Sequence, residues 1–251
     1  LFGLLLIFIF SYMEQNTLYK LSIYLFCLTF LLLILVPIFG IEVKGSKRWL
    51  DLIFLPRLQP IEFVKPFFII ILSLIISYEK LPNFTLKFFI SLLLTLSITT
   101  LLVIQPDLGQ TLLIGFCWAI LIFISGINLL FLTSISLIGV VSLLYLAFYV
   151  PKFEYIKNRL LSFFNSETGT YNFQSDKAID SITSGGFFGK GIGEGTLKNR
   201  VPEAHTDYII SVISEEFGVI AIILILVLFL IFIFSILKKV SKEPDNKIKL
   251  I

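Results

Sequence analysis

The sequence predicts an all-α, polytopic membrane protein, and two observations carry that prediction. Hydrophobic residues make up 57% of the 251 residues, phenylalanine alone occurs 27 times, and the mean hydropathy is +0.97. A soluble globular domain is less apolar than this. The apolar residues are also gathered into long runs, and a run of roughly 20 residues crosses about 30 Å of hydrocarbon at 1.5 Å per residue. We therefore expect a helical bundle embedded in lipid.

Six apolar runs qualify as complete spans, and one further run is shorter. Leu1 to Phe10 opens the chain inside an apolar run, without the basic start and small-residue cleavage site of a signal peptide. We expect it to be the end of a span, and the chain to be a fragment. The complete spans are predicted, in order, at 20–40, 60–77, 86–104, 110–126, 129–150 and 207–236.

A long polar connection, residues 151–206, separates the last two predicted spans. Connections of this length are uncommon unless they are functional or disordered. Its many aromatic residues and glycines argue against disorder. We expect a large, packed extracytoplasmic loop within a single integral membrane domain that covers residues 1–251.

Lysine and arginine residues set the expected orientation. The short loops and tails on one side of the membrane carry eight of these cations and those on the other side carry four, which places the C-terminus in the cytoplasm. The net charge of +3 is too small to indicate nucleic acid binding. Cys27 and Cys117 lie inside predicted spans and give no disulfide or metal signal. The eight cytoplasmic cations are Lys20, Lys80, Lys87, Lys238, Lys239, Lys242, Lys247 and Lys249.

The first external loop, residues 41–58, carries a basic cluster beside an aromatic side chain. Lys44, Lys47 and Arg48 lie within the five residues before Trp49. The indole ring of Trp49 suits two roles, an anchor at the lipid headgroups or a surface for a sugar ring. Both roles stay open at this point.

Charged residues also occur within predicted spans. Glu62 and Lys65 are three positions apart, so on a helix they share one face and neutralise each other, most simply as a structural pair. Pro106 and Gly109 flank Asp107 in the middle of a long apolar stretch and predict a turn or a broken helix. Lipid tolerates such a break only where protein or water satisfies the freed backbone groups. Asp107 is therefore expected to face a turn, a cavity or a neighbouring helix.

Four glycines alternate in the long loop, at positions 189, 191, 193 and 195. This spacing is typical of turning or extended backbone and excludes a helix. Lys190 is followed by glycine where a phosphate-binding P-loop requires serine or threonine, so a nucleotide site is not indicated.

The start of the last span gives the sharpest local prediction. If the helix begins between 202 and 206, one polar stripe forms along it, and such a stripe faces protein or a water-filled cleft. A carboxylate at a helix N-terminus stays ionised, as a base or a cation ligand must be. A solvated loop entering a helix is the simpler alternative. The stripe consists of Asp207, Ser211, Ser214, Glu215 and Gly218, and His205, the only histidine, lies two residues before it.

Four ordered motifs resemble the SEDS family of FtsW, RodA and SpoVE. They are GSKRWLDL at 45–52, QPIEFVK at 59–65, QPDLGQTLLI at 105–114, and SGGFFGKGIGEGT with PEAHTDYIISVISEEFG within 184–218. The resemblance covers nearly the whole chain. Ala204 and the RWLDL motif at 48–52 are more similar to the division member FtsW than to the elongation member RodA. Family proteins have ten spans, so the chain is expected to hold part of the second through the eighth.

The resemblance implies a peptidoglycan glycosyltransferase that polymerises lipid II, a disaccharide-pentapeptide carried on undecaprenyl pyrophosphate, during cell division. Asp207 matches an essential family aspartate that is proposed to activate the acceptor hydroxyl, and Trp49 matches a required tryptophan. The implied partners are a class B penicillin-binding protein, which is a transpeptidase, other divisome proteins and membrane lipids. The implied location is the bacterial inner membrane, with the active site on the extracytoplasmic face.

Such a reaction needs a carboxylate for the proton and positive charge for the pyrophosphate leaving group. A divalent cation such as Mg or Mn is a further source of charge, and whether a metal is required stays open. Alternatives are a lipid II flippase or transporter, a RodA-like elongation polymerase, and a scaffold for the transpeptidase. The candidate cations are Lys44, Lys47, Arg48, Lys190, Lys198 and Arg200, and the supporting candidates are Glu62, Lys65, Asp107, His205, Ser211 and Glu215.

Overall fold

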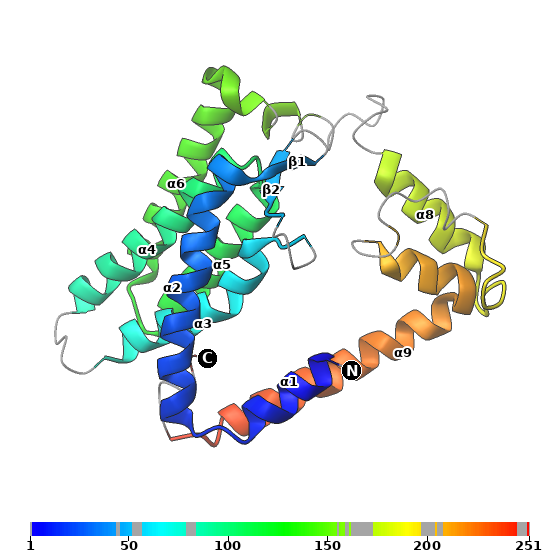
Figure 1. Ribbon diagram of the computed structural model, residues 1–251, viewed down its shortest axis with the longest axis horizontal. Helices are drawn as coiled ribbons and strands as arrows, with labels where there is room; N and C mark the ends of the chain where they lie inside the picture. The colour runs from blue at the N-terminus through cyan, green and yellow to red at the C-terminus, as the bar shows by residue number, and fades with distance from the viewer. Residues whose placement is uncertain are drawn as a thin grey trace. The chain divides into compact units, whose positions relative to one another are not determined.

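The computed structural model divides the chain into two compact units, which are described separately (Figure 1). The first unit comprises Leu1–Tyr149 with Pro244–Ile251, and the second comprises Val150–Glu243. The prediction of a single membrane domain with a loop at 151–206 stays a prediction. The structure describes residues 2–43, 46–51, 57–78, 84–154, 156–158, 161, 173–196, 204, 208–244 and 250.

The first unit is a helical bundle with one small hairpin. Strand β2 pairs antiparallel with β1, and Trp49 of β2 lies opposite Ile41. The sequence did not predict this hairpin, because strands of three and four residues are too short to show a period of two. The elements are α1 (Phe2–Ser11), α2 (Gln15–Phe39), β1 (Ile41–Val43), β2 (Ser46–Trp49), α3 (Pro60–Ser77), α4 (Phe84–Ile104), α5 (Leu108–Ile124) and α6 (Leu129–Tyr149).

The helices follow the predicted spans closely. Five helices in the described part of the chain are long and apolar enough to cross a membrane, namely α2, α3, α4, α6 and α9 (Ile209–Val240). Helix α5 has 17 residues and is shorter than a complete span. The multi-pass, all-α membrane architecture is confirmed, and the predicted total of six spans stays open.

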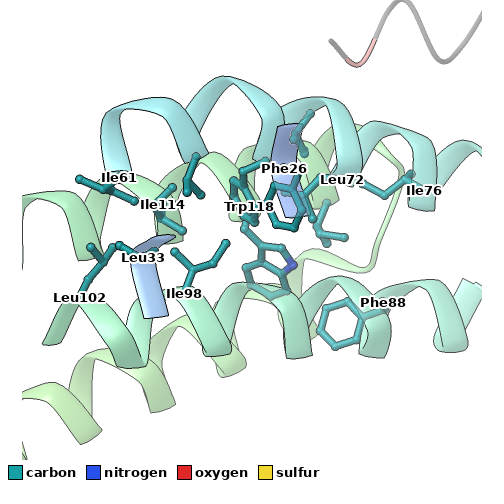
Figure 2. Close-up of a cluster of buried hydrophobic side chains, with 14 of the residues drawn as sticks. Phe26, Leu33, Ile61, Leu72, Ile76, Phe88, Ile98, Leu102, Ile114 and Trp118 are labelled. Atoms are coloured by element: carbon teal, nitrogen blue, oxygen red, sulfur yellow. The ribbon is translucent and has the colours of Figure 1, made fainter. Parts of the chain in front are cut away.

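The core of the first unit lies between α2, α3, α4 and α5 (Figure 2). Leu33, Leu72 and Leu102 are fully buried in it. The indole N–H of Trp118 donates a hydrogen bond to the hydroxyl of Ser91 at 3.1 Å, so the one polar atom of this large side chain is satisfied inside the bundle. This packing fixes the helix ends that carry the charged residues.

The second unit contains the short 3-10 helix η1 (Pro151–Phe153), α8 (Phe173–Gly185) and α9. Helix α9 begins at Ile209, so the predicted start between 202 and 206 is wrong. Tyr208 has non-helical dihedral angles, with φ −112° and ψ 26°, and packs with Ala178 and Ala204 instead of entering the helix.

Helix α9 is also broken, whereas the sequence predicted one continuous helix over 207–236. Gly218 has φ 78° and ψ 179°, which separates a short piece, residues 209–217, from a long apolar piece, residues 219–240. The bend is visible in the orange ribbon of α9 in Figure 1. Sequence periodicity alone could not reveal the break, because apolar residues continue on both sides of Gly218 and a single glycine inside a helix does not by itself indicate an interruption.

Candidate functional site

The predicted polar stripe on α9 is buried against protein. Ser211, Ser214, Glu215 and Gly218 are all buried, which agrees with the expectation for these four positions. They face α8, which presents small residues that allow two helices to approach closely. A Cβ atom on Gly185 would lie 2.0 Å from the carbonyl oxygen of Ser214, so only glycine fits there.

Glu215 is the centre of this packing, and its side chain is 0% exposed. Its Oε1 atom lies 3.2 Å from the ammonium nitrogen of Lys190, and its Oε2 atom accepts a hydrogen bond of 3.2 Å from the hydroxyl of Ser181. A buried charge is tolerated only when such partners neutralise and solvate it. Glu215 therefore ties α8 and the following glycine-rich segment to α9.

That segment, which we call the glycine loop (residues 186–195), repairs the first side of the break in α9. The break leaves carbonyl groups at the end of the short piece without helical partners. The backbone N–H of Lys190 donates to the carbonyl of Glu215 at 2.9 Å, and the N–H of Gly191 donates to the carbonyl of Glu216 at 3.1 Å. Both freed acceptors are thus satisfied by the loop.

The same loop repairs the other side of the break. The long piece of α9 starts with amide groups that have no carbonyl one turn earlier. The N–H of Val219 donates to the carbonyl of Gly186 at 3.0 Å, and the N–H of Ile220 donates to the carbonyl of Phe187 at 3.4 Å. Unsatisfied backbone groups cost several kcal/mol in hydrocarbon, so the loop and the broken helix form one structural unit.

The alternating glycines, interpreted from the sequence as turning backbone, have a steric reason at two positions. A Cβ atom on Gly189 would lie 2.2 Å from the carbonyl oxygen of Glu216, and one on Gly218 would lie 2.2 Å from that of Phe187. Both glycines also have a φ near +78°. The loop backbone can therefore approach α9 closely only because side chains are missing at both contacts.

We expect Gly189→Ala to destabilise the protein far more than Gly193→Ala. Both glycines have positive φ, +77° and +84°, so both substitutions share the cost of a left-handed alanine, about 1–2 kcal/mol. Only Gly189 also faces a backbone contact, whereas nothing lies within 4 Å of a Cβ at Gly193. Denaturation of the purified full-length variants in detergent measures the difference. Equal losses of unfolding free energy would show that the loop does not pack against α9.

A second polar cluster lies in the first unit, at the turn between α4 and α5. The guanidinium group of Arg48 donates to the backbone carbonyls of Gln105, at 3.3 Å, and of Pro106. Its Nε atom also lies 3.7 Å from the carboxylate of Asp107, which caps α5 by accepting from the N–H of Gln110. The expected turn is thus present, and Arg48 satisfies its freed carbonyls.

The charged residues of α3 pair within the first unit. Lys65 and Glu62 lie 2.7 Å apart, the arrangement expected from their spacing, and the side-chain amide of Gln110 donates to Glu62 at 3.0 Å. Sequence reasoning did not select Gln110 or Ser181 as functional residues. Each could have been noticed as a hydrogen-bonding side chain in an unusual place, Gln110 inside an otherwise apolar helix and Ser181 shortly before a glycine turn.

The other predicted residues divide into those the structure describes and those it does not. Trp49 is half-buried in β2, and Lys47 is exposed on the same strand. Lys190, a candidate pyrophosphate ligand, is engaged by Glu215 and remains 35% exposed. Within the described ranges, no group of three or more His, Cys, Asp or Glu residues suits a metal ion. Lys44, Lys198, Arg200, His205 and Asp207 lie outside the described residues.

The described site is thus a scaffold on both sides of the gap that contains Asp207. Ala204 before it packs with Ala178 of α8, and Tyr208 after it packs against this pair. The hydroxyl of Ser211 donates to the carbonyl of Tyr208 at 2.7 Å, which fixes the backbone at the helix start. Both carboxylate oxygens of Glu215 contact structural partners, Lys190 and Ser181, so Glu215 is better suited to hold other residues in position than to transfer a proton.

Comparison with known proteins identifies a family. The model of the FtsW/RodA/SpoVE family, described as cell cycle proteins, matches residues 1–251. A protein of Caulobacter vibrioides named probable peptidoglycan glycosyltransferase FtsW is 34% identical over 195 residues, which cover 75% of this chain and 47% of that protein. The protein of the same name from Coxiella burnetii is 36% identical over 209 residues, covering 80% and 55%. The chain spans about half the length of these curated relatives.

Solved structures share the fold. The rod shape determining protein RodA of Thermus thermophilus aligns with a TM-score of 0.64 and 24% identity, over 99% of this chain and 65% of that chain. A chain from a structure described as a peptidoglycan synthase complex that coordinates polymerization and crosslinking aligns with a TM-score of 0.74 and 23% identity, over 99% and 69%. At these identities the likeness shows the fold alone.

Proposed function

Because the chain belongs to the FtsW/RodA/SpoVE family, we propose that the full-length protein is a peptidoglycan glycosyltransferase that polymerises lipid II into glycan strands during cell division. The observation that carries this proposal is the family match over residues 1–251, with relatives of that name at 34–36% identity. The proposed location is the bacterial inner membrane, with the active site on its extracytoplasmic face.

In the proposed reaction, a sugar hydroxyl of the acceptor attacks the anomeric carbon of the donor. A carbon–oxygen bond forms there as the bond to the pyrophosphate breaks, and undecaprenyl pyrophosphate leaves with its electron pair. The proton of the hydroxyl passes to the carboxylate of Asp207 as the new bond forms. Cations offset the charge that develops on the leaving group.

The described scaffold supports this assignment by what it holds in place. The packing of Tyr208 against Ala178 and Ala204 and the hydrogen bond from the hydroxyl of Ser211 to the carbonyl of Tyr208 fix the backbone immediately after Asp207. A catalytic group must be held within fractions of an ångström to be effective, and this rigidity suits that need. Lys190 and Glu215 are proposed as positioning residues, since they hold the loop on α9.

Other candidates take roles according to their contacts. Trp49, half-buried and two residues after the exposed Lys47, is proposed to hold a sugar ring or a headgroup. Arg48 is proposed to maintain the α4–α5 turn through its contacts with Asp107 and the turn carbonyls. A class B penicillin-binding protein and further divisome proteins are proposed as partners, and the fold shared with a chain of a peptidoglycan synthase complex supports the first of these.

Reconstitution separates polymerisation from transport. The full-length protein and its transpeptidase are placed in vesicles with labelled lipid II, and two quantities are measured, namely polymer on a gel and lipid II moved between leaflets. The proposal predicts polymer. Movement of lipid II without polymer would contradict it and favour a flippase. Pairing of Glu62 with Lys65 and of Arg48 with Asp107 already neutralises charges that a transporter would need for its substrate.

A further inference from the structure

Three large apolar side chains on the glycine loop are left open to the surroundings. Phe187 is 74% exposed, Phe188 is 83% exposed and Ile192 is 78% exposed. Two adjacent exposed phenylalanines on a tightly held loop are unusual for a surface that faces only water. The backbone around them is fixed by the contacts with α9, so they are held outward.

The hydrogen bonds of the loop set its depth relative to α9. The carbonyls of Gly186 and Phe187 accept hydrogen bonds from the amides of Val219 and Ile220. This end of the loop, which we call the loop apex, therefore lies beside the first turn of the long piece of α9. The contact at Gly218 gives the same alignment of loop and helix, because the missing Cβ of this glycine makes room for the carbonyl of Phe187. The apex and this helix start therefore share one level.

That level is the boundary of the hydrocarbon. The stretch from Val219 to Leu237 contains 19 residues and no charge, and it is followed directly by Lys238 and Lys239. At 1.5 Å per residue it is about 28 Å long, close to the ~30 Å thickness of the hydrocarbon core. With the two lysines at one boundary, Val219 lies at the other.

We propose that Phe187, Phe188 and Ile192 form a membrane anchor that inserts into the acyl chains of the leaflet at the Val219 end of α9. The occupant of this surface is lipid, because the surface continues the lipid-facing face of α9 at the same level. Transfer of a phenylalanine side chain from water into the acyl chains is favourable, because its apolar surface is removed from water. Glu194, exposed on the same loop, remains in the headgroup region.

The anchor sets the height of the glycine loop above the bilayer, and through Lys190 and Glu215 it sets the height of the short piece of α9. The anchor depends on the depth of the loop in the membrane and is independent of the proposed glycosyltransferase activity.

Spin-label accessibility tests the anchor. A nitroxide is attached at Phe188→Cys in the full-length protein, with all its native cysteines, Cys27 and Cys117 among them, replaced by serine, in vesicles of phosphatidylethanolamine and phosphatidylglycerol. Leu228→Cys, in the middle of the long piece of α9, is the lipid reference, and Asp180→Cys, exposed on α8, is the polar reference. Collisions with oxygen, which concentrates in lipid, and with a water-soluble nickel complex are compared at each site.

We expect the ratio of oxygen to nickel collisions at position 188 to be several-fold higher than at 180 and to lie below the value at 228. A ratio at 188 equal to that at 180 would place the loop in water and overturn the proposal. Exclusion of both reagents at 188 would also overturn it, because the side chain would then be covered by protein. Labels at Phe187→Cys and Ile192→Cys are expected to follow position 188.

Discussion

Asp207→Asn, introduced into the full-length protein, is expected to lower the initial rate of lipid II polymerisation about 10²- to 10⁴-fold. The amide keeps the size and shape of the side chain but cannot accept the proton of the attacking hydroxyl. Its neighbours Ala204 and Tyr208 pack with α8 through contacts that do not use the carboxylate, so the fold is expected to survive. Initial rates of polymer formation at equal concentrations of folded protein measure the effect.

Asp180→Asn is the matched control for this substitution. Asp180 lies on α8 of the same unit, is 54% exposed and pairs only at the surface with Lys177, at 3.0 Å. Exposed pairs of this kind contribute about 0–1 kcal/mol, so the control is expected to keep the parent rate. Equal rates for Asp207→Asn and Asp180→Asn would remove Asp207 from the mechanism.

Lys190→Met is expected to lower the free energy of unfolding by about 3 kcal/mol, near the lower end of the range for breaking a buried ion pair. The substitution removes the ammonium group that lies 3.2 Å from the fully buried carboxylate of Glu215, while the partial exposure of Lys190 moderates the loss. Polymerisation is expected to fall as well, since the glycine loop is no longer held on α9. Denaturation in detergent gives the stability, and the rate is measured below the unfolding transition.

Removing both charges tests whether the two residues act as a pair. In the double variant Lys190→Met with Glu215→Gln, the glutamine is neutral and can still bond to Ser181. Its loss of unfolding free energy is therefore expected to be smaller than the sum of the losses of the two single variants. Lys177→Met, at an exposed pair on α8, is the control and is expected to change stability by less than about 1 kcal/mol. Additive losses would show that Lys190 and Glu215 do not interact.

The hydrophobic pattern predicted most of the fold. Spans such as 60–77 and 129–150 agree with α3 and α6 within one residue, because lipid requires long apolar runs and ends them at polar flanks. The stripe of Ser211, Ser214 and Glu215 was predictable for the same reason, since a polar face on a membrane helix has to be covered.

The partners that cover the stripe were not predictable from local sequence. The contact of Glu215 with Lys190 joins residues 25 positions apart, and that of Arg48 with Pro106 joins residues 58 positions apart. The break in α9 depends on hydrogen bonds from the glycine loop, so Gly218 alone, inside an apolar helix, could not indicate it. The start of α9 at Ile209 likewise depends on the tertiary packing of Tyr208.

These contacts show that the glycine loop stabilises the broken helix α9. It supplies the hydrogen-bond partners on both sides of the broken helix, and it carries the lysine that neutralises the buried Glu215. A continuous helix would direct the short piece of α9 along the axis of the long piece. The break frees the short piece to pack on α8, and this piece begins two residues after Asp207.

Release of undecaprenyl pyrophosphate per disaccharide added is the measurement that tests the proposed reaction most directly. The full-length protein is incubated with its transpeptidase and lipid II, and both products are quantified in the same samples. We predict that polymer and undecaprenyl pyrophosphate appear together in a constant ratio for the parent protein and that both are lost in Asp207→Asn. Undiminished formation of both products by Asp207→Asn, or disappearance of lipid II from its leaflet with neither product formed, would contradict the account.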